Sequence, residues 1–193
     1  MTVPSRATAP STQLRLRSGT ARLVWPAGAT GPGVMVLLVE PDAMDEADRV
    51  SRSLAAVPGI LSLSAVCRPG HELEDGAASI EWIADHAAQL GADGRRLILA
   101  GLDGGAAVAA ALTIRARDRG WPTVAHQVLI QPRLSAAPVR ETELAGVAAA
   151  TVIGGDADSR AYLDRLRRAG VGVWQLDCAD LPRHLAAVLR LAD

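Results

Sequence analysis

Short runs of consecutive apolar residues, separated by helical patterns, constrain the fold of this 193-residue chain more than any other feature. Two clear runs are Val34–Val39 (VMVLLV) and Arg96–Ala100 (RLILA). Such runs are typical of strands that are buried on both faces of a sheet. Helical patterns at Asp45–Val57 and Leu73–Leu90 lie between them. The alternation predicts an α/β fold with a mostly parallel sheet flanked by helices on both faces.

The remaining elements continue this alternation within one domain. Further strands are predicted at Ala21–Pro26, Gly59–Cys67, His126–Ile130, Ala150–Ile153 and Gly172–Leu176. Further helices are predicted at Asp103–Asp118, Asp158–Ala169 and Leu181–Leu191. The length suits a single domain, which we assign to residues 14–193. Residues 1–13 are rich in Ser, Thr, Pro and Ala and are expected to form a flexible N-terminal tail.

The composition excludes several classes of function. The net charge is −1, and aromatic residues make up only 3% of the chain, so nucleic-acid binding is not expected. The 20 basic residues are all Arg, which excludes a Schiff-base lysine and a P-loop lysine. Cys67 and Cys178 are far apart and form no metal-binding spacing, so we predict neither a metal nor another cofactor. We expect no membrane association and a cytoplasmic location, because the chain shows no long apolar run and no signal sequence.

The strand-to-helix turn around Asp103 carries the most specific local signal. In a parallel sheet, ligand sites lie at the carboxyl ends of the strands. One such end reads Ala-Gly-Leu-Asp-Gly-Gly, so that Gly101, Gly104 and Gly105 surround Asp103. Small residues on both sides of a central residue are typical of a nucleophile elbow, a sharp turn that lifts one side chain above the sheet. The central residue is usually Ser, and here it is Asp.

Several segments in this order resemble the hormone-sensitive-lipase-like branch of the α/β-hydrolases, a group of carboxylesterases and lipases. They are LEDG at Leu73–Gly76, AGLDGG at Ala100–Gly105, RARDRG at Arg115–Gly120 and QVLIQP at Gln127–Pro132. The resemblance covers most of Arg22–Leu185. It implies a minimal α/β-hydrolase core, and we expect no cap domain because only a short linker separates Pro132 from Ala150.

The resemblance also indicates which residues stand at the family's functional positions. The nucleophilic Ser corresponds to Asp103, and the catalytic acid corresponds best to Asp156. The catalytic histidine corresponds to His184 or, without a gap, to Arg183. The His-Gly-Gly-Gly motif of the oxyanion hole corresponds to a segment of different chemistry, namely Glu40, Pro41, Asp42 and Ala43.

These replacements argue against serine-esterase chemistry. An oxyanion hole needs backbone N–H donors, and Pro41 has none. Asp42 would place negative charge beside the developing oxyanion. We therefore predict a pseudoenzyme that acts in binding or as a scaffold. Two alternatives stay open: a hydrolase with Asp103 as nucleophile, or a cyclase or lyase with Asp103 or His184 as general base.

The replaced residues also predict an acidic sheet edge. Glu40, Asp42, Asp103 and Asp156 should gather there, and Arg183 is a candidate ion-pair partner for Asp156. The partner of such a protein would be an unidentified small molecule or another protein. An uncapped sheet edge would also favour homo-oligomer formation.

Overall fold

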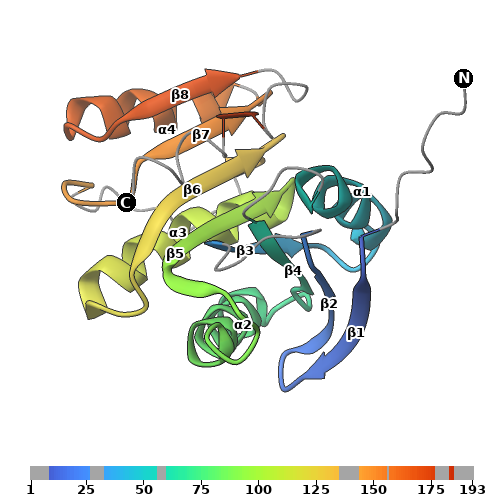
Figure 1. Ribbon diagram of the computed structural model, residues 1–193. Helices are drawn as coiled ribbons and strands as arrows, with labels where there is room; N and C mark the ends of the chain where they lie inside the picture. Colours follow the sequence, from blue (N-terminus) through green and yellow to red (C-terminus); the bar gives the residue numbers. More distant parts are fainter. Residues whose placement is uncertain are drawn as a thin grey trace, which may run out of the picture.

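A single eight-stranded sheet organises the chain in the computed structural model (Figure 1). The structure describes residues 9–26, 33–55, 60–134, 144–155, 157–176 and 183–184. The strands are β1 (Ser11–Leu16), β2 (Gly19–Val24), β3 (Gly33–Val39), β4 (Ile60–Val66), β5 (Asp93–Leu102), β6 (Val124–Ile130), β7 (Ala150–Ile153) and β8 (Val173–Leu176). Their order across the sheet is β1-β2-β4-β3-β5-β6-β7-β8. From β4 to β8 every neighbouring pair is parallel, whereas β1 and β2 are antiparallel additions at one edge.

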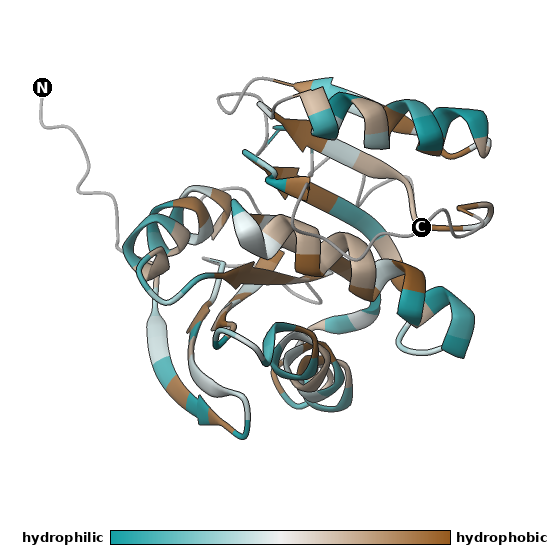
Figure 2. Cartoon of the chain, turned by 180° about the vertical axis from the view of Figure 1, so that it is seen from behind, coloured by the Kyte–Doolittle hydropathy of each residue, from teal (hydrophilic) through white to brown (hydrophobic). Residues whose placement is uncertain are grey.

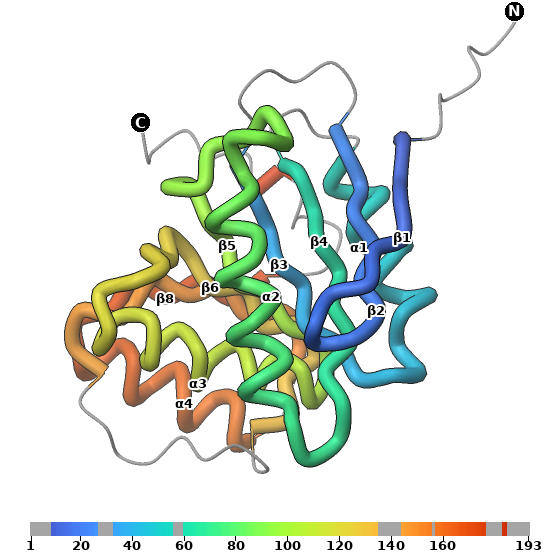
Figure 3. Tube along the Cα trace, turned by 90° about the horizontal axis from the view of Figure 1, so that it is seen from below, coloured from blue at the N-terminus to red at the C-terminus, as the bar shows by residue number. Residues whose placement is uncertain are grey.

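In the described part of the chain, four helices with assigned bounds cover the two faces of the sheet. They are α1 (Met44–Ala55), α2 (Glu72–His86), α3 (Gly104–Arg119) and α4 (Ala157–Arg168). α2, α3 and α4 contribute to one buried apolar cluster, and α1 contributes to the cluster on the opposite face. Figure 3 shows α2, α3 and α4 on the near side of the strands. The predicted mostly parallel sheet with helices on both faces is confirmed.

The central strands are apolar because they are covered on both sides. All seven residues of β3 are buried, as are the last six of β5. Figure 2 shows hydrophobic colour concentrated on the central strands, with hydrophilic colour on α4 and β1. Parallel strands buried in this way place their carboxyl ends along one edge, and the loops at that edge carry the candidate site.

The predicted flexible tail needs one correction. β1 begins at Ser11, so Ser11–Gln13 belong to a strand that pairs with β2. Leu14 and Leu16 of the same strand pack against the main apolar cluster, which gives this polar hairpin its attachment to the sheet. Residues 1–8 of the predicted tail, and all of the predicted helix Leu181–Leu191 except residues 183–184, lie outside the described residues. No helix in the described ranges is long and apolar enough to span a membrane.

Candidate active site at the turn after β5

Asp103 stands alone between the end of β5 and the start of α3. Its backbone has φ 52° and ψ −118°, a conformation that residues other than glycine rarely adopt. Such backbone strain costs about 1–3 kcal/mol and persists only where the surrounding structure enforces it. The strand-to-helix turn thus holds its central residue in a strained conformation that presents the side chain at the sheet edge.

Two glycines make this sharp turn possible. A Cβ atom on Gly101 would lie 2.2 Å from the carbonyl oxygen of Gly105. A Cβ atom on Gly105 would lie 2.1 Å from the carbonyl oxygen of Leu38 in β3. The first turn of α3 therefore packs directly on strand backbone, and only glycine allows that approach.

The backbone of Asp103 is also fixed from the neighbouring strand. Its N–H donates to the Ile130 carbonyl at 3.0 Å, and its carbonyl accepts from the Arg133 N–H at 3.3 Å. The Asp103 side chain, by contrast, makes no hydrogen bond to any other described residue. The backbone at this position is therefore held by hydrogen bonds, whereas its carboxylate is not engaged by a base within the described part of the chain.

Glu40 brings a second carboxylate to the same turn. It follows β3 and is the first residue of the segment that corresponds to the oxyanion motif. Arg133 Nη2 donates to Glu40 Oε2 at 2.5 Å. On its other side the carboxylate covers Gly104, since a Cβ atom there would lie 2.9 Å from Glu40 Oε1. Glu40 therefore lies at the N-terminus of α3, where the backbone N–H groups and the helix dipole favour negative charge.

The other residues of that segment contribute less. Asp42 is exposed, and the Ala43 N–H donates to the Glu40 carbonyl at 3.1 Å within a turn. That N–H is therefore occupied by the turn. Pro41 lines the cavity described below but has no N–H to offer.

His184 lies in a different environment. Its Nε2 is 2.8 Å from Thr151 Oγ1, and that hydroxyl is also 2.8 Å from His126 Nε2. The exposed ring of Trp174 lies 5.5 Å from the His184 ring, centroid to centroid. Thr151 pairs with Val128, two residues before the end of β6, so this contact is made to the body of the sheet.

Burial sets the ionisation of both histidines. Desolvation, followed by repulsion from His184, lowers the pKa of His126 to about 4. Desolvation also lowers the pKa of His184. Both rings are therefore neutral at neutral pH, and the contacts described for them are those of a packed polar cluster.

The structure thus brings together part of the predicted site. Asp103, Glu40 and the elbow glycines meet at one turn, whereas no hydrogen bond joins His184 to Asp103. Asp156 and Cys178 lie outside the described residues, so the predicted Asp156–Arg183 ion pair stays a prediction. Arg183 itself is exposed.

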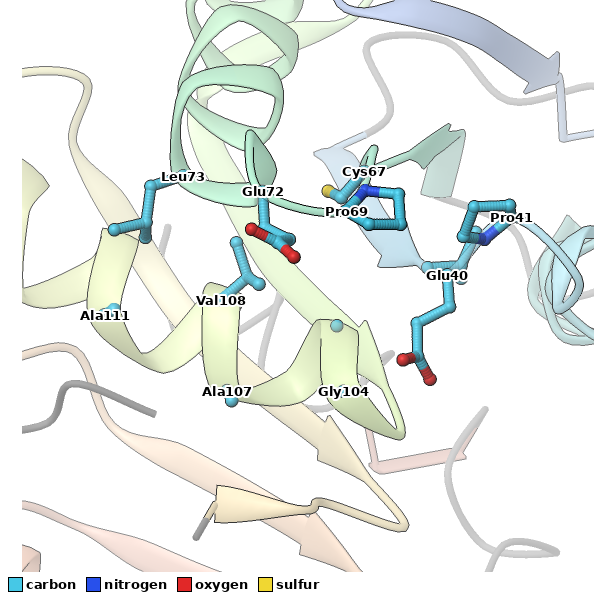
Figure 4. A pocket seen from close by; sticks show the side chains of 12 residues that line it. Glu40, Pro41, Cys67, Pro69, Glu72, Leu73, Gly104, Ala107, Val108 and Ala111 are labelled. Atoms are coloured by element: carbon cyan, nitrogen blue, oxygen red, sulfur yellow. The ribbon is translucent and has the colours of Figure 1, made fainter. Parts of the chain in front are cut away.

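Two features of the site were missed from the sequence. No motif points to Arg133, although Gln131–Arg133 follows β6 at the same sheet edge, where ligand sites of parallel sheets lie. The second feature is a cavity of about 350 Å³ beside the turn (Figure 4). It is lined by residues from the end of β3 and the loop after it, the loop before α2, α2 itself and α3: Val39, Glu40, Pro41, Cys67, Pro69, Glu72, Leu73, Gly104, Gly105, Ala107, Val108 and Ala111.

Comparison with known proteins now places this turn in a family. A family model described as the alpha/beta hydrolase fold matches residues 68–168, more than half of the chain. The chain belongs to the α/β-hydrolase fold family. The matched range contains the elbow around Asp103 and most of the motifs quoted above. The predicted resemblance to the hormone-sensitive-lipase-like branch is confirmed by esterases with related sequences.

Two curated relatives come from Mycobacterium tuberculosis. Esterase LipI is 42% identical over 60 residues, which cover 31% of this chain and 19% of LipI. Carboxylesterase NlhH is 32% identical over 95 residues, which cover 46% of this chain and 30% of NlhH. The similarity therefore spans less than a third of either α/β-hydrolase relative.

Solved structures share the fold over nearly the whole chain. DphMB1 has a TM-score of 0.80 at 22% identity, covering 97% of this chain and 87% of its own. A bacterial heroin esterase has a TM-score of 0.75 at 20% identity, and the match covers 95% of this chain and 83% of the esterase. A thermostable esterase from Pseudomonas putida ECU1011 has a TM-score of 0.73 at 19% identity, and the match covers 95% of this chain and 80% of the esterase. These likenesses establish the α/β-hydrolase fold of the chain.

Proposed function

We propose that this α/β-hydrolase-fold protein is a pseudoenzyme that binds a ligand or partner without hydrolysing esters. The position of the Glu40 carboxylate carries the proposal. It covers Gly104 at the N-terminus of α3 and is held there by Arg133. Ester hydrolysis would require free N–H donors and no negative charge at this end of the helix, because the transition state develops an oxyanion.

The energetic consequence of this arrangement is large. Loss of a single oxyanion donor costs about 2.7–4 kcal/mol of transition-state stabilisation, or a factor of roughly 100 to 1,000 in rate. Here Pro41 offers no donor, the Ala43 N–H is occupied by a turn, and Glu40 adds a like charge. Asp103 also lacks the hydroxyl that forms an acyl-enzyme. The separate losses point to the same non-hydrolytic function.

One observation favours a second candidate, a hydrolase that uses Asp103 as nucleophile. The strained backbone at Asp103 is the kind of outlier that occurs at functional sites, where the strain serves to present a side chain. A carboxylate nucleophile forms an ester with the substrate, and a base-activated water must then open that ester. The contact of His184 with Thr151 rather than Asp103 counts against this candidate.

The test is hydrolysis of a series of p-nitrophenyl acyl esters, extended to an epoxide and a haloalkane probe. The proteins compared are the wild type, Asp103→Asn, Asp103→Ser and the double variant Asp103→Ser/Glu40→Gly. We expect no turnover by the wild type or by Asp103→Ser, because restoring the hydroxyl leaves Glu40 in place. Turnover that is lost in Asp103→Asn would support the second candidate and refute the pseudoenzyme. Turnover that survives in Asp103→Asn would also refute the pseudoenzyme, with the reaction located elsewhere.

A further inference from the structure

The lining of the cavity beside the elbow indicates which class of ligand the cavity could bind, which the proposed function leaves open. Most of its twelve lining residues are apolar or glycine. Two carboxylates, Glu40 and Glu72, face it from different elements, and none of the described residues that line it is basic. A volume of about 350 Å³ lies within the range of small-molecule sites, roughly 300–1,000 Å³.

Figure 4 shows how the two carboxylates are placed. Glu72 projects from the start of α2 toward α3 near Val108, and Glu40 lies beside the first turn of α3 at Gly104. Leu73, Val108 and Ala111 form the apolar wall on the Glu72 side. A ligand in this space would meet hydrocarbon on its flanks and negative charge at Glu72.

Glu72 is held in place and ionised. The Gly70 N–H donates to Glu72 Oε1 at 2.9 Å, and this bond lowers the pKa of the Glu72 carboxyl below its usual range. An ionised carboxylate can accept about four hydrogen bonds, so this fixed group keeps capacity for a ligand. Its place at the N-terminus of α2 further favours the charged form.

Two nearby arginines are each paired with a carboxylate. Arg68 forms a two-point ion pair with the buried Asp75, with Nη2 2.7 Å from Oδ1 and Nε 2.8 Å from Oδ2. Arg133 is engaged with Glu40. The Cys67 thiol lies in the cavity wall. Burial, with the charges of Asp75 and Glu72, raises its pKa to about 12.

We propose that this cavity binds a small organic cation, an ammonium group on a short hydrocarbon body, with Glu72 as the charged partner. The hydrocarbon packs against Leu73, Val108 and Ala111. Apolar walls with a fixed carboxylate favour a cation over a neutral or anionic ligand of the same shape. The ammonium adds Coulomb attraction to its hydrogen bond with Glu72, a hydroxyl makes the hydrogen bond alone, and a carboxylate is repelled. The inference names the ligand class of the binding function proposed above and rests on that proposal.

The experiment is a calorimetric titration of the full chain with three probes of one shape: n-hexylammonium, n-hexanol and n-hexanoate. We expect hexylammonium to bind in the millimolar range and to bind more tightly than hexanol, with no binding of hexanoate. Equal binding of hexanol, binding of hexanoate, or no binding of hexylammonium at millimolar concentration would each overturn the proposal.

Two variants and a control locate the site. Glu72→Gln keeps the shape and one accepting oxygen but removes the charge, and should weaken the binding of hexylammonium at least about tenfold. Ala111→Leu should weaken the binding of hexylammonium and of hexanol alike, because the larger side chain fills part of the cavity. Glu74→Gln is the matched control: it removes an exposed charge from the same helical turn outside the cavity and should leave the affinity within about twofold. Equal effects of Glu72→Gln and Glu74→Gln would place binding elsewhere and refute the site.

The readouts separate the two proposals. Circular dichroism checks that each variant is folded, and Ala111→Leu serves as the test if Glu72→Gln is not. Ester turnover by the wild type would refute the pseudoenzyme whatever the titrations show. Absence of both turnover and hexylammonium binding would refute only the cation site.

Discussion

The Arg133 guanidinium donates to the Glu40 carboxylate at 2.5 Å and joins the loop after β6 to the loop after β3. The two residues are 93 positions apart, yet they meet over the first turn of α3. Under the proposed function, this contact occupies the region where an esterase of this fold would stabilise an oxyanion.

Because both partners are exposed, the Glu40–Arg133 pair should contribute little to stability. Their side chains are 45% and 59% exposed, and exposed ion pairs are worth about 0–1 kcal/mol. We expect Arg133→Ala to lower the free energy of unfolding by less than about 1 kcal/mol in urea titrations. Arg167→Ala, which removes the exposed Arg167–Asp164 pair, is the control. A markedly larger loss for Arg133→Ala would show that this pair supports the fold.

Backbone strain at Asp103 should be measurable as stability gained on its removal. Asp103→Gly relieves a strain of about 1–3 kcal/mol and gives back about 0.5–1 kcal/mol through the greater freedom of glycine in the unfolded chain. We expect a net gain of about 1 kcal/mol in the free energy of unfolding. Asp103→Ala keeps the Cβ atom and the strain, so it should give no comparable gain. Equal effects of the two variants would contradict a strained turn.

Protonation of the buried His126 should make the protein acid-sensitive. Its folded pKa of about 4 lies below the unfolded value of 6.5, so the unfolded chain binds the proton more readily. The contribution of the neutral His126 to the free energy of unfolding is therefore fully present above pH 6.5 and is lost as the pH falls toward 4. We expect about 2 kcal/mol less stability at pH 5 than at pH 8, measured by urea unfolding.

His184, whose pKa is also lowered by burial, acts in the same direction. His126→Gln should flatten the pH dependence between 5 and 8. His71→Gln, at an exposed position in the loop before α2, should leave it unchanged. A wild-type stability that does not change over this range would refute the buried, neutral histidine.

The thiol of Cys67 should be inert in the folded protein. It is free and buried, and its pKa is raised to about 12; only the thiolate is nucleophilic. In a Cys178→Ser background, so that Cys67 alone is read, we expect no alkylation by iodoacetamide at pH 8. Addition of urea to unfold the protein should make the thiol react at the rate of a free cysteine. Rapid alkylation without urea would show that the cavity wall opens in solution.

The carboxyl group of Asp75 should contribute stability that is lost in acid. It is buried, and the Arg68 guanidinium together with the Arg68 N–H holds its pKa below the usual range. Its contribution is present above the unfolded pKa of about 4 and is lost as the pH falls through the folded value. Asp75→Asn should reduce the free energy of unfolding at pH 7 by about 1–3 kcal/mol. Glu74→Gln, an exposed neighbour, should change it by less than about half a kcal/mol.

Much of the fold could be predicted from the sequence, because a doubly covered sheet needs continuous apolar strands. The predicted strand Ala150–Ile153 coincides with β7, and Asp158–Ala169 differs from α4 by one residue at each end. β5 is longer than predicted: it starts at Asp93 rather than Arg96, because Asp93 pairs with Gly33 of β3 before a register shift, and these polar first residues are not fully buried. β1 was missed because only Leu14 and Leu16 of its six residues are apolar.

The site was less predictable because it depends on contacts between distant segments. The elbow could be placed at Asp103 because close backbone packing demands glycine at fixed positions, which the sequence displays directly. The partner of Glu40 lies two strands away in the sheet, and no local pattern specifies that distance. The contact of His184 with Thr151 likewise joins residues 33 positions apart.

The hydrogen bonds that fix residue 103 come from the main chain of Ile130, Arg133 and Ala106, and the close approaches around it are made by glycines. None of these contacts involves the side chain of residue 103. The side chain of residue 103 can therefore be replaced without changing the backbone contacts that hold the turn. For protein engineering, the turn is therefore a position at which a thiol, an amide or an unnatural nucleophile could be introduced while the surrounding backbone stays unchanged.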